Sequence, residues 1–194
     1  MIRILTLITV VSICVFAAGC SNPFAPPVIG AGTLAPIMAQ NCEECPDSTN
    51  AFAVISNFKY AYENRDLDIY ENCLDDDFIF IYIDQNAYGE IEEVEIPRDG
   101  TSGDLFRTGR LFEAFDEIRL NTWIPVRLEP EEPELHNGEI WEIWQVNFHL
   151  SLRDLSGAYN YQQFEANGLA FYKIRKSPDG YWRIVLWEDL SFSF

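Results

Sequence analysis

Residues 51–83, AFAVISNFKYAYENRDLDIYENCLDDDFIFIYI, contain the pattern that decides the fold. Apolar side chains recur at helical spacing in its first half, which predicts an amphipathic helix over 50–64. A polar break follows, and a short second helix is expected over 67–73. Every residue of 78–83 is aromatic or β-branched, which predicts a strand. The chain therefore enters its first strand only after two helices.

A third helix and four long strands are predicted further along the chain. Thr101 and Asp104 have the spacing of a capping box, which indicates a helix from there to about 115. The acidic segment 84–100 before it reads as a loop. Strands are then expected over 118–128, 140–153, 159–176 and 181–192, with Pro125 indicating an edge or a bulge. From Trp144 onward, the strand over 140–153 alternates apolar and polar residues, so one of its faces is expected to be buried.

Two segments carry a resemblance to a known superfamily. The first is the link Arg65-Asp66-Leu67-Asp68 with its flanking helices, and the second is the closing stretch 180–189, GYWRIVLWED. Together with the element order, they resemble the nuclear transport factor 2-like, or SnoaL-like, superfamily. The resemblance extends over 47–194 and implies an α+β fold. In that fold, three N-terminal helices pack in a curved, mixed but mostly antiparallel β-sheet that forms a cone-shaped barrel around an open pocket.

The resemblance also implies which side chains line such a pocket. The expected lining residues are Phe58, Tyr62, Phe80, Tyr82, Asp84, His149 and Asp189. Ketosteroid isomerases of this superfamily place a tyrosine and a general-base aspartate where this chain has Phe58 and Tyr82. A phenylalanine cannot donate a hydrogen bond to an enolate, and a tyrosine with a pKa near 10 is a poor base at neutral pH. That chemistry is therefore disfavoured, and no catalytic residue, cofactor or metal is assigned.

The N-terminus has the pattern of a secretory signal. Arg3 precedes an apolar stretch over 4–16, which is shorter than the roughly 20 residues of a membrane-spanning helix. The segment Ala17-Ala18-Gly19-Cys20 resembles the bacterial lipobox. The resemblance implies removal of 1–19, a lipid on Cys20 and a Pro-rich flexible tether over 20–46. The alternatives are an ordinary signal peptide and an uncleaved anchor.

The lipobox resemblance further implies an address in the cell envelope. The lipid on Cys20 would anchor the chain to a membrane. In Gram-negative lipoproteins an aspartate after the lipidated cysteine favours retention in the inner membrane, and here that position is Ser21. The expected location is the outer membrane, facing the periplasm.

Three cysteines remain after Cys20. Cys42 and Cys45 have the spacing of a redox motif, but they follow a Pro-rich segment, and two glutamates between them would raise the pKa of both thiols. A structural disulfide is therefore preferred, either between Cys42 and Cys45 or between one of them and Cys73. A metal site lacks further ligands, since the chain has only 2 histidines.

Charge and composition restrict the classes of partner. The chain has 13 basic and 31 acidic residues, a net charge of −18, which argues against nucleic acid and against electrostatic attachment to anionic lipid. The expected function is a non-catalytic domain that binds a small apolar or aromatic ligand, or a protein partner, in its pocket. The alternative is an isomerase, dehydratase or hydrolase that uses Asp84, His149 or Asp189. A homodimer through the outer face of the sheet, near Trp141 and Ile143, is also expected.

Overall fold

The computed structural model describes residues 48–85, 90–129, 135–136, 139–157 and 163–193. Its three helices are α1 (Ala51–Asn64), α2 (Leu67–Cys73) and α3 (Asp104–Ala114), as predicted. In the part of the chain described, none of the helices combines the length and the apolar character needed to cross a membrane.

Local hydrogen bonds explain where the first two helices begin and end. The Asn50 side chain accepts from the Ala53 N–H at 2.9 Å and starts α1, while Arg65 ends it in the left-handed conformation with φ 55°. The Asp66 side chain then accepts from the Ile69 N–H at 3.0 Å and starts α2. The polar break between the helices is thus a C-cap followed directly by an N-cap.

The strands form one large, mostly antiparallel sheet. They are β1 (Leu74–Gln85), β2 (Ile91–Pro97), β3 (Glu117–Leu128), β6 (Glu142–Arg153), β7 (Phe164–Lys176), β8 (Trp182–Asp189) and β9 (Phe192–Ser193). Their order is β2-β1-β8-β7-β6-β3, with β9 beside β7, and only β1 and β8 run parallel. The short strands β4 (Leu135–His136) and β5 (Glu139–Ile140) pair separately.

The strand β2 corrects the prediction of a loop over 84–100. Its three glutamates obscure the alternation that would indicate a strand, and only Val94 and Ile96 turn toward the core. Ile96 is 2% exposed. On the opposite edge lies β3, which contains Pro125, so the predicted edge is confirmed. The register shift of β3 lies between Leu120 and Thr122 and not at Pro125, which pairs regularly with Val146.

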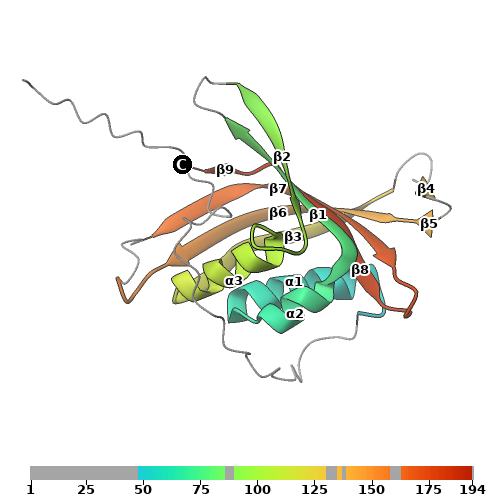
Figure 1. The fold of residues 1–194 in the computed structure, drawn as a ribbon, viewed down its shortest axis with the longest axis horizontal. Helices are drawn as coiled ribbons and strands as arrows, with labels where there is room; N and C mark the ends of the chain where they lie inside the picture. The colour runs from blue at the N-terminus through green and yellow to red at the C-terminus, as the bar shows by residue number, and fades with distance from the viewer. Residues whose placement is uncertain (1–47, 86–89, 130–134, 137–138, 158–162, 194) are drawn as a thin grey trace, which may run out of the picture.

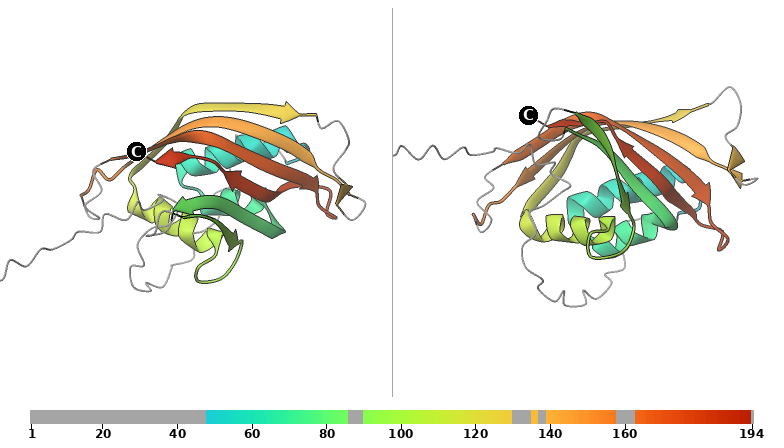
Figure 2. Two further views of the ribbon diagram at one scale, coloured as in Figure 1. Left: turned by 90° about the horizontal axis from the view of Figure 1, so that it is seen from above. Right: turned by 45° about the horizontal axis from the view of Figure 1, so that its top comes forward.

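The sheet curves around the helices (Figure 1). All three helices lie on its concave side, and the strands arch over them (Figure 2). The two edge strands β2 and β3 do not pair with each other in the strand order, so the cone is an open sheet and not a closed barrel. The space between helices and sheet is where the predicted site residues gather.

Candidate functional site

Aromatic side chains fill the interior of the cone. Phe58, in the middle of α1, lies at the centre of this cluster. Its ring centroid is 5.0 Å from Tyr62, 5.2 Å from Trp187, 5.4 Å from Tyr70 and Tyr172, and 5.9 Å from Trp123. Phe80 adds a contact of 4.4 Å with Trp187. The rings thus come from two helices and four strands.

Residue spacing and strand register explain why these side chains converge. Phe58 and Tyr62 are four residues apart and share one face of α1. In the sheet, Phe80 pairs with Trp187, and Tyr82 pairs with Asp189. Cross-strand partners point to the same face, so all four side chains lie on the concave side. Five of the seven predicted lining residues are therefore buried in the interior.

The other two predicted residues lie differently. His149 lies between the inward residues Phe148 and Leu150, so it points to the outer face, where its Nε2 is 3.7 Å from a carboxylate oxygen of Glu165. It does not reach the interior, which corrects its place in the predicted site. Asp84 is two residues beyond Tyr82 on the same side of β1 and is half-buried, opposite Glu92.

Asp189 is the most unusual polar group of the interior. The residue is 2% exposed, and its Oδ1 accepts from the Ser191 N–H at 2.7 Å. Its Oδ2 is buried and makes no hydrogen bond. Burial raises the pKa of this carboxyl to about 6, although hydrogen bonding from Ser191 acts in the opposite direction. One oxygen of this buried carboxyl therefore has no hydrogen-bond partner.

Other polar atoms of the interior also lack partners. The Trp123 Nε1 is buried without a hydrogen bond. The Tyr62 hydroxyl lies near Tyr70 and Thr108 but makes no hydrogen bond of good geometry. Buried donors and acceptors are nearly always paired in folded proteins, so each of these atoms requires an explanation.

A second buried carboxyl was missed by sequence reasoning. The Tyr70 hydroxyl donates to Oδ2 of Asp104 at 2.6 Å, and Asp104 is 3% exposed. Burial raises the pKa of Asp104 to about 7, against the effects of the Tyr70 hydrogen bond and the nearby Arg107. The capping-box prediction is wrong, since the N-cap is Gly103 and no side chain caps α3. No sequence pattern pointed to a tyrosine of α2 facing the start of α3.

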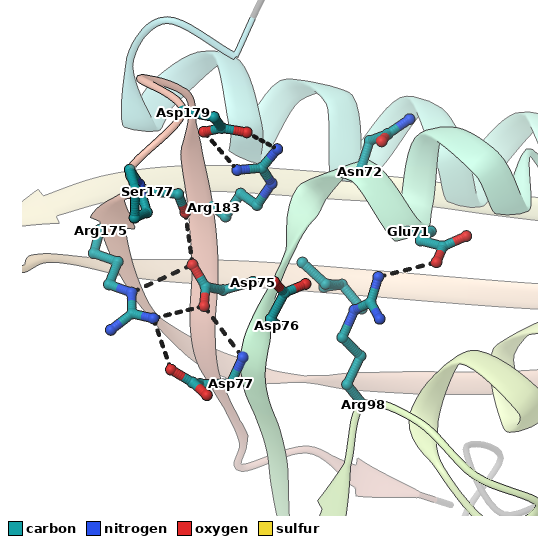
Figure 3. Close-up of a pocket in the computed structure, with 12 residues that line it drawn as sticks. Glu71, Asn72, Asp75, Asp76, Asp77, Arg98, Arg175, Ser177, Asp179 and Arg183 are labelled. Atoms are coloured by element: carbon teal, nitrogen blue, oxygen red, sulfur yellow. Dashed lines mark hydrogen bonds and ion pairs between the residues drawn. The ribbon is translucent and has the colours of Figure 1, made fainter.

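A surface pocket of about 630 Å³ lies on another part of the molecule (Figure 3). Its lining is mostly charged: Glu71, Asn72, Leu74, Asp75, Asp76, Asp77, Arg98, Arg175, Ser177, Pro178, Asp179 and Arg183. The labelled arginines each point to a carboxylate rather than into open space (Figure 3). Arg98 lies 2.9 Å from a carboxylate oxygen of Glu71, and Arg183 lies 2.6 Å from one of Asp179.

The buried Asp75 holds one wall of this pocket together. It accepts from Arg175 Nη2 at 2.7 Å, from the Ser177 hydroxyl at 2.6 Å and from the Asp77 N–H at 3.2 Å. Burial acts to raise the pKa of Asp75, but the hydrogen bonds from Arg175 and Ser177 outweigh it and hold the pKa below its usual value. These contacts tie the start of β1 to the end of β7, so this pocket wall is a structural joint.

The described residues include one cysteine, Cys73, and no cluster of metal-ligating side chains. No group of three histidine, cysteine or acidic side chains there is arranged to hold a metal ion. Cys73 is a free, buried thiol that donates to the Val54 carbonyl at 3.8 Å, and burial raises its pKa. This free thiol does not fit the alternative in which Cys73 forms a disulfide with Cys42 or Cys45. Cys20, Cys42 and Cys45 lie outside the described residues, so the lipid and the 42–45 disulfide stay predictions.

Solved structures with the same architecture include a conserved protein from Planctomyces limnophilus, with a TM-score of 0.52 and 15% identity over 74% of this chain and 94% of that one. A protein from Novosphingobium aromaticivorans assigned as an aromatic ring hydroxylase has a TM-score of 0.50 and 13% identity. The match covers 78% of this chain and 96% of that one. A nuclear transport factor 2-like superfamily protein from Salmonella enterica has a TM-score of 0.46 and 14% identity. The match covers 70% of this chain and 84% of that one. No family model and no curated protein matches the sequence. At such identities the likeness is one of fold.

Proposed function

Starting from its nuclear transport factor 2-like fold, we propose that this chain is a lipid-anchored domain of the cell envelope that binds a small molecule inside the cone. The observation that carries the proposal is the set of buried polar atoms without partners at Asp189 and Trp123, with the Tyr62 hydroxyl nearby. Leaving a buried donor or acceptor unpaired costs about 1–3 kcal/mol. A bound molecule with polar groups would supply the missing partners.

The surrounding surface favours a ligand with an apolar or aromatic body. Ligand sites are commonly lined by hydrophobic and aromatic side chains, with a few polar groups that fix the orientation. The interior has that composition, since Phe58, Phe80, Tyr172 and Trp187 belong to one buried cluster and the buried Asp189 lies two residues after Trp187 on β8. Because these side chains are buried, a small molecule is preferred to a protein partner as the ligand.

The anchoring part of the proposal rests on the N-terminal sequence. The segment 17–20 supports acylation of Cys20, and the Pro-rich segment 20–46 supports a tether of at most roughly 90 Å when fully extended. Intact-mass measurement of the membrane-extracted chain should show a lipid and the loss of 1–19. A Cys20→Ala variant that still carries lipid would contradict the anchoring.

The binding part is tested by recovering the ligand. The chain is purified without added small molecules and denatured, and the released molecules are identified by mass spectrometry. Ala170→Val serves as the comparison, because Ala170 is fully buried and pairs with Asp189 on the inner face, so a larger side chain would intrude on the interior there. We expect a molecule that is released from the parent chain and depleted in the folded variant. Recovery of nothing from the parent chain would contradict the proposal.

One observation favours an acid–base enzyme as a second candidate. The pKa values of Asp104 and Asp189 are raised to about 7 and about 6, which suits proton transfer near neutral pH. In such an enzyme, Asp189 would act as predicted from the sequence. Asp104 would take the role that the sequence suggested for His149. A ligand recovered chemically unchanged after long incubation would speak for binding. Turnover that Asp189→Asn abolishes would speak for the enzyme.

The sheet also supports the expected pairing with a second copy of the chain. Its outer face exposes Ile83, Ile124, Val126 and Leu169, of which Ile124 is 55% exposed. Ile124 and Leu169 lie in one cross-strand row on either side of Asn147. We therefore propose that two copies of the chain pair through this face. Measuring the oligomeric state of the chain in solution tests this proposal.

A further inference from the structure

The described chain enters the fold at one end of the molecule, where the start of α1 lies next to the turn between β7 and β8 (Figure 1). The Trp182 N–H donates to the Ser48 carbonyl at 2.8 Å, which fixes this entry beside the first residue of β8. The proposed tether over 20–46 leads from the lipid on Cys20 to this point. This end is therefore the part of the folded domain that follows the anchor most closely along the chain.

Aromatic side chains gather at this end, and two of them are exposed to solvent. Phe52, in the first turn of α1, is 53% exposed, and its ring centroid is 5.8 Å from that of Trp144 on β6. Tyr181, just before β8, is 45% exposed, and its neighbour Trp182 is partly buried. Only β7 separates β6 from β8, which places those two strands roughly 10 Å apart. These four residues form what we call the aromatic rim.

The charged residues that flank the aromatic rim in sequence or in strand register do not share the acidic excess of the chain, whose net charge is −18. Asp179 is paired with Arg183 at 2.6 Å, and Glu142 with Arg127 at 3.4 Å. Lys176, at the end of β7 next to the rim, adds a positive charge. These flanking residues therefore oppose contact with a phospholipid surface less than the rest of this acidic chain does.

We infer that the aromatic rim lies in the interface of the membrane that holds the lipid anchor, with its rings among the phospholipid headgroups. The inference rests on the proposed anchoring and adds an orientation of the domain to it. Tyrosine and tryptophan favour the membrane–water interface because their rings are apolar at one end and polar at the other.

The tether makes a weak contact of this kind sufficient. Each of the two exposed rings, Phe52 and Tyr181, presents roughly 100 Å² of surface, and its burial raises a partition coefficient by about tenfold or more. Two such rings hold a free domain only weakly at a membrane. A domain tethered to that membrane has a high effective concentration there, so the same contact is occupied much of the time.

Quenching of tryptophan emission by brominated lipid tests this contact. The full lipidated chain is reconstituted into phosphatidylcholine vesicles with and without bromine on the acyl chains near the headgroups, and we expect the bromine to lower the emission of Trp144 and Trp182. The double substitution Phe52→Ser and Tyr181→Ser should reduce this quenching about twofold or more, because it removes the two exposed rings. Leu155→Ser is the matched control: Leu155 is 71% exposed just beyond the far end of β6, and its loss should leave the quenching unchanged.

The anchor and the rim contact can fail separately. Unquenched emission from a chain whose mass shows the lipid would overturn the inference and leave the anchoring intact, whereas a chain without lipid would overturn both. Equal quenching of the parent chain and the double variant would show that the tether alone brings the domain to the bilayer, and the inference would be wrong. It would also be wrong if the double substitution separated two copies of the chain in sedimentation, because the rim would then be a protein interface. Should the double variant not fold, Tyr181→Ser alone takes its place with the same direction expected.

Discussion

Replacing Asp104 with asparagine should make the protein more stable at neutral and alkaline pH. Asp104 is 3% exposed, and its pKa is raised from the usual 3.8 to about 7 by burial. Because the folded state holds this proton more tightly than the unfolded chain, the stability contribution is complete at low pH. It is lost as the pH rises through 7.

The size of the effect follows from the two pKa values. The gap between 3.8 and about 7, at 1.36 kcal/mol per pH unit, corresponds to an order-of-magnitude loss of about 4 kcal/mol between pH 4 and pH 8. An asparagine at this position carries no charge and keeps an oxygen that can accept from the Tyr70 hydroxyl, which lies 2.6 Å from the carboxylate. The variant should therefore lose little stability over that range.

Urea unfolding at half-unit steps from pH 5 to pH 8 measures this difference. The free energy of unfolding of the parent chain should fall with pH, and that of Asp104→Asn should fall much less. Asp189→Asn should remove a smaller part of the slope, because the pKa of Asp189 is about 6. Asp76→Asn, an exposed carboxylate, serves as the control and should follow the parent chain. Parallel curves for Asp104→Asn and the parent chain would refute the reasoning.

Three further substitutions test other parts of the structure. Gly168→Ala should destabilise the chain by about 1–3 kcal/mol in urea unfolding, because the added Cβ would lie 2.4 Å from Ser191 Cα; unchanged stability would show that this close approach is not required. Arg175→Met leaves Asp75 without its cation and should cost about 3 kcal/mol at pH 7. That cost should shrink below pH 4 as Asp75 is protonated, and a pH-independent cost would point to packing instead. Ile124→Glu should convert a dimer to a monomer in sedimentation experiments, whereas an unchanged sedimentation coefficient would rule out pairing through this face.

The sequence predicted the order of elements because their periodicities are strong. The stretch over 51–83 switches from helical spacing to a run of strand formers, and the alternation after Trp144 marks a sheet with one buried face. The strand β2 was not predicted because three of its seven residues are glutamates and only Val94 and Ile96 turn inward. Edge strands bury little, so their patterns are weak.

The sequence predicted a site residue correctly only where helix spacing or strand alternation determines the side that its side chain faces. Phe58, Tyr62, Phe80, Tyr82 and Asp189 all lie in the interior, as a helix face and alternating strand positions indicate. The contact between Tyr70 and Asp104 joins the second and third helices across 34 residues of sequence. It depends on how those helices dock, which neither local spacing nor composition specifies.

The most direct test of the account is the identification of small molecules released from the purified full chain. The account predicts a molecule with an apolar or aromatic body that is depleted in the folded Ala170→Val variant. A parent chain that releases nothing, and whose interior polar atoms are found bonded to ordered water alone, would contradict the proposal that this cone binds a ligand.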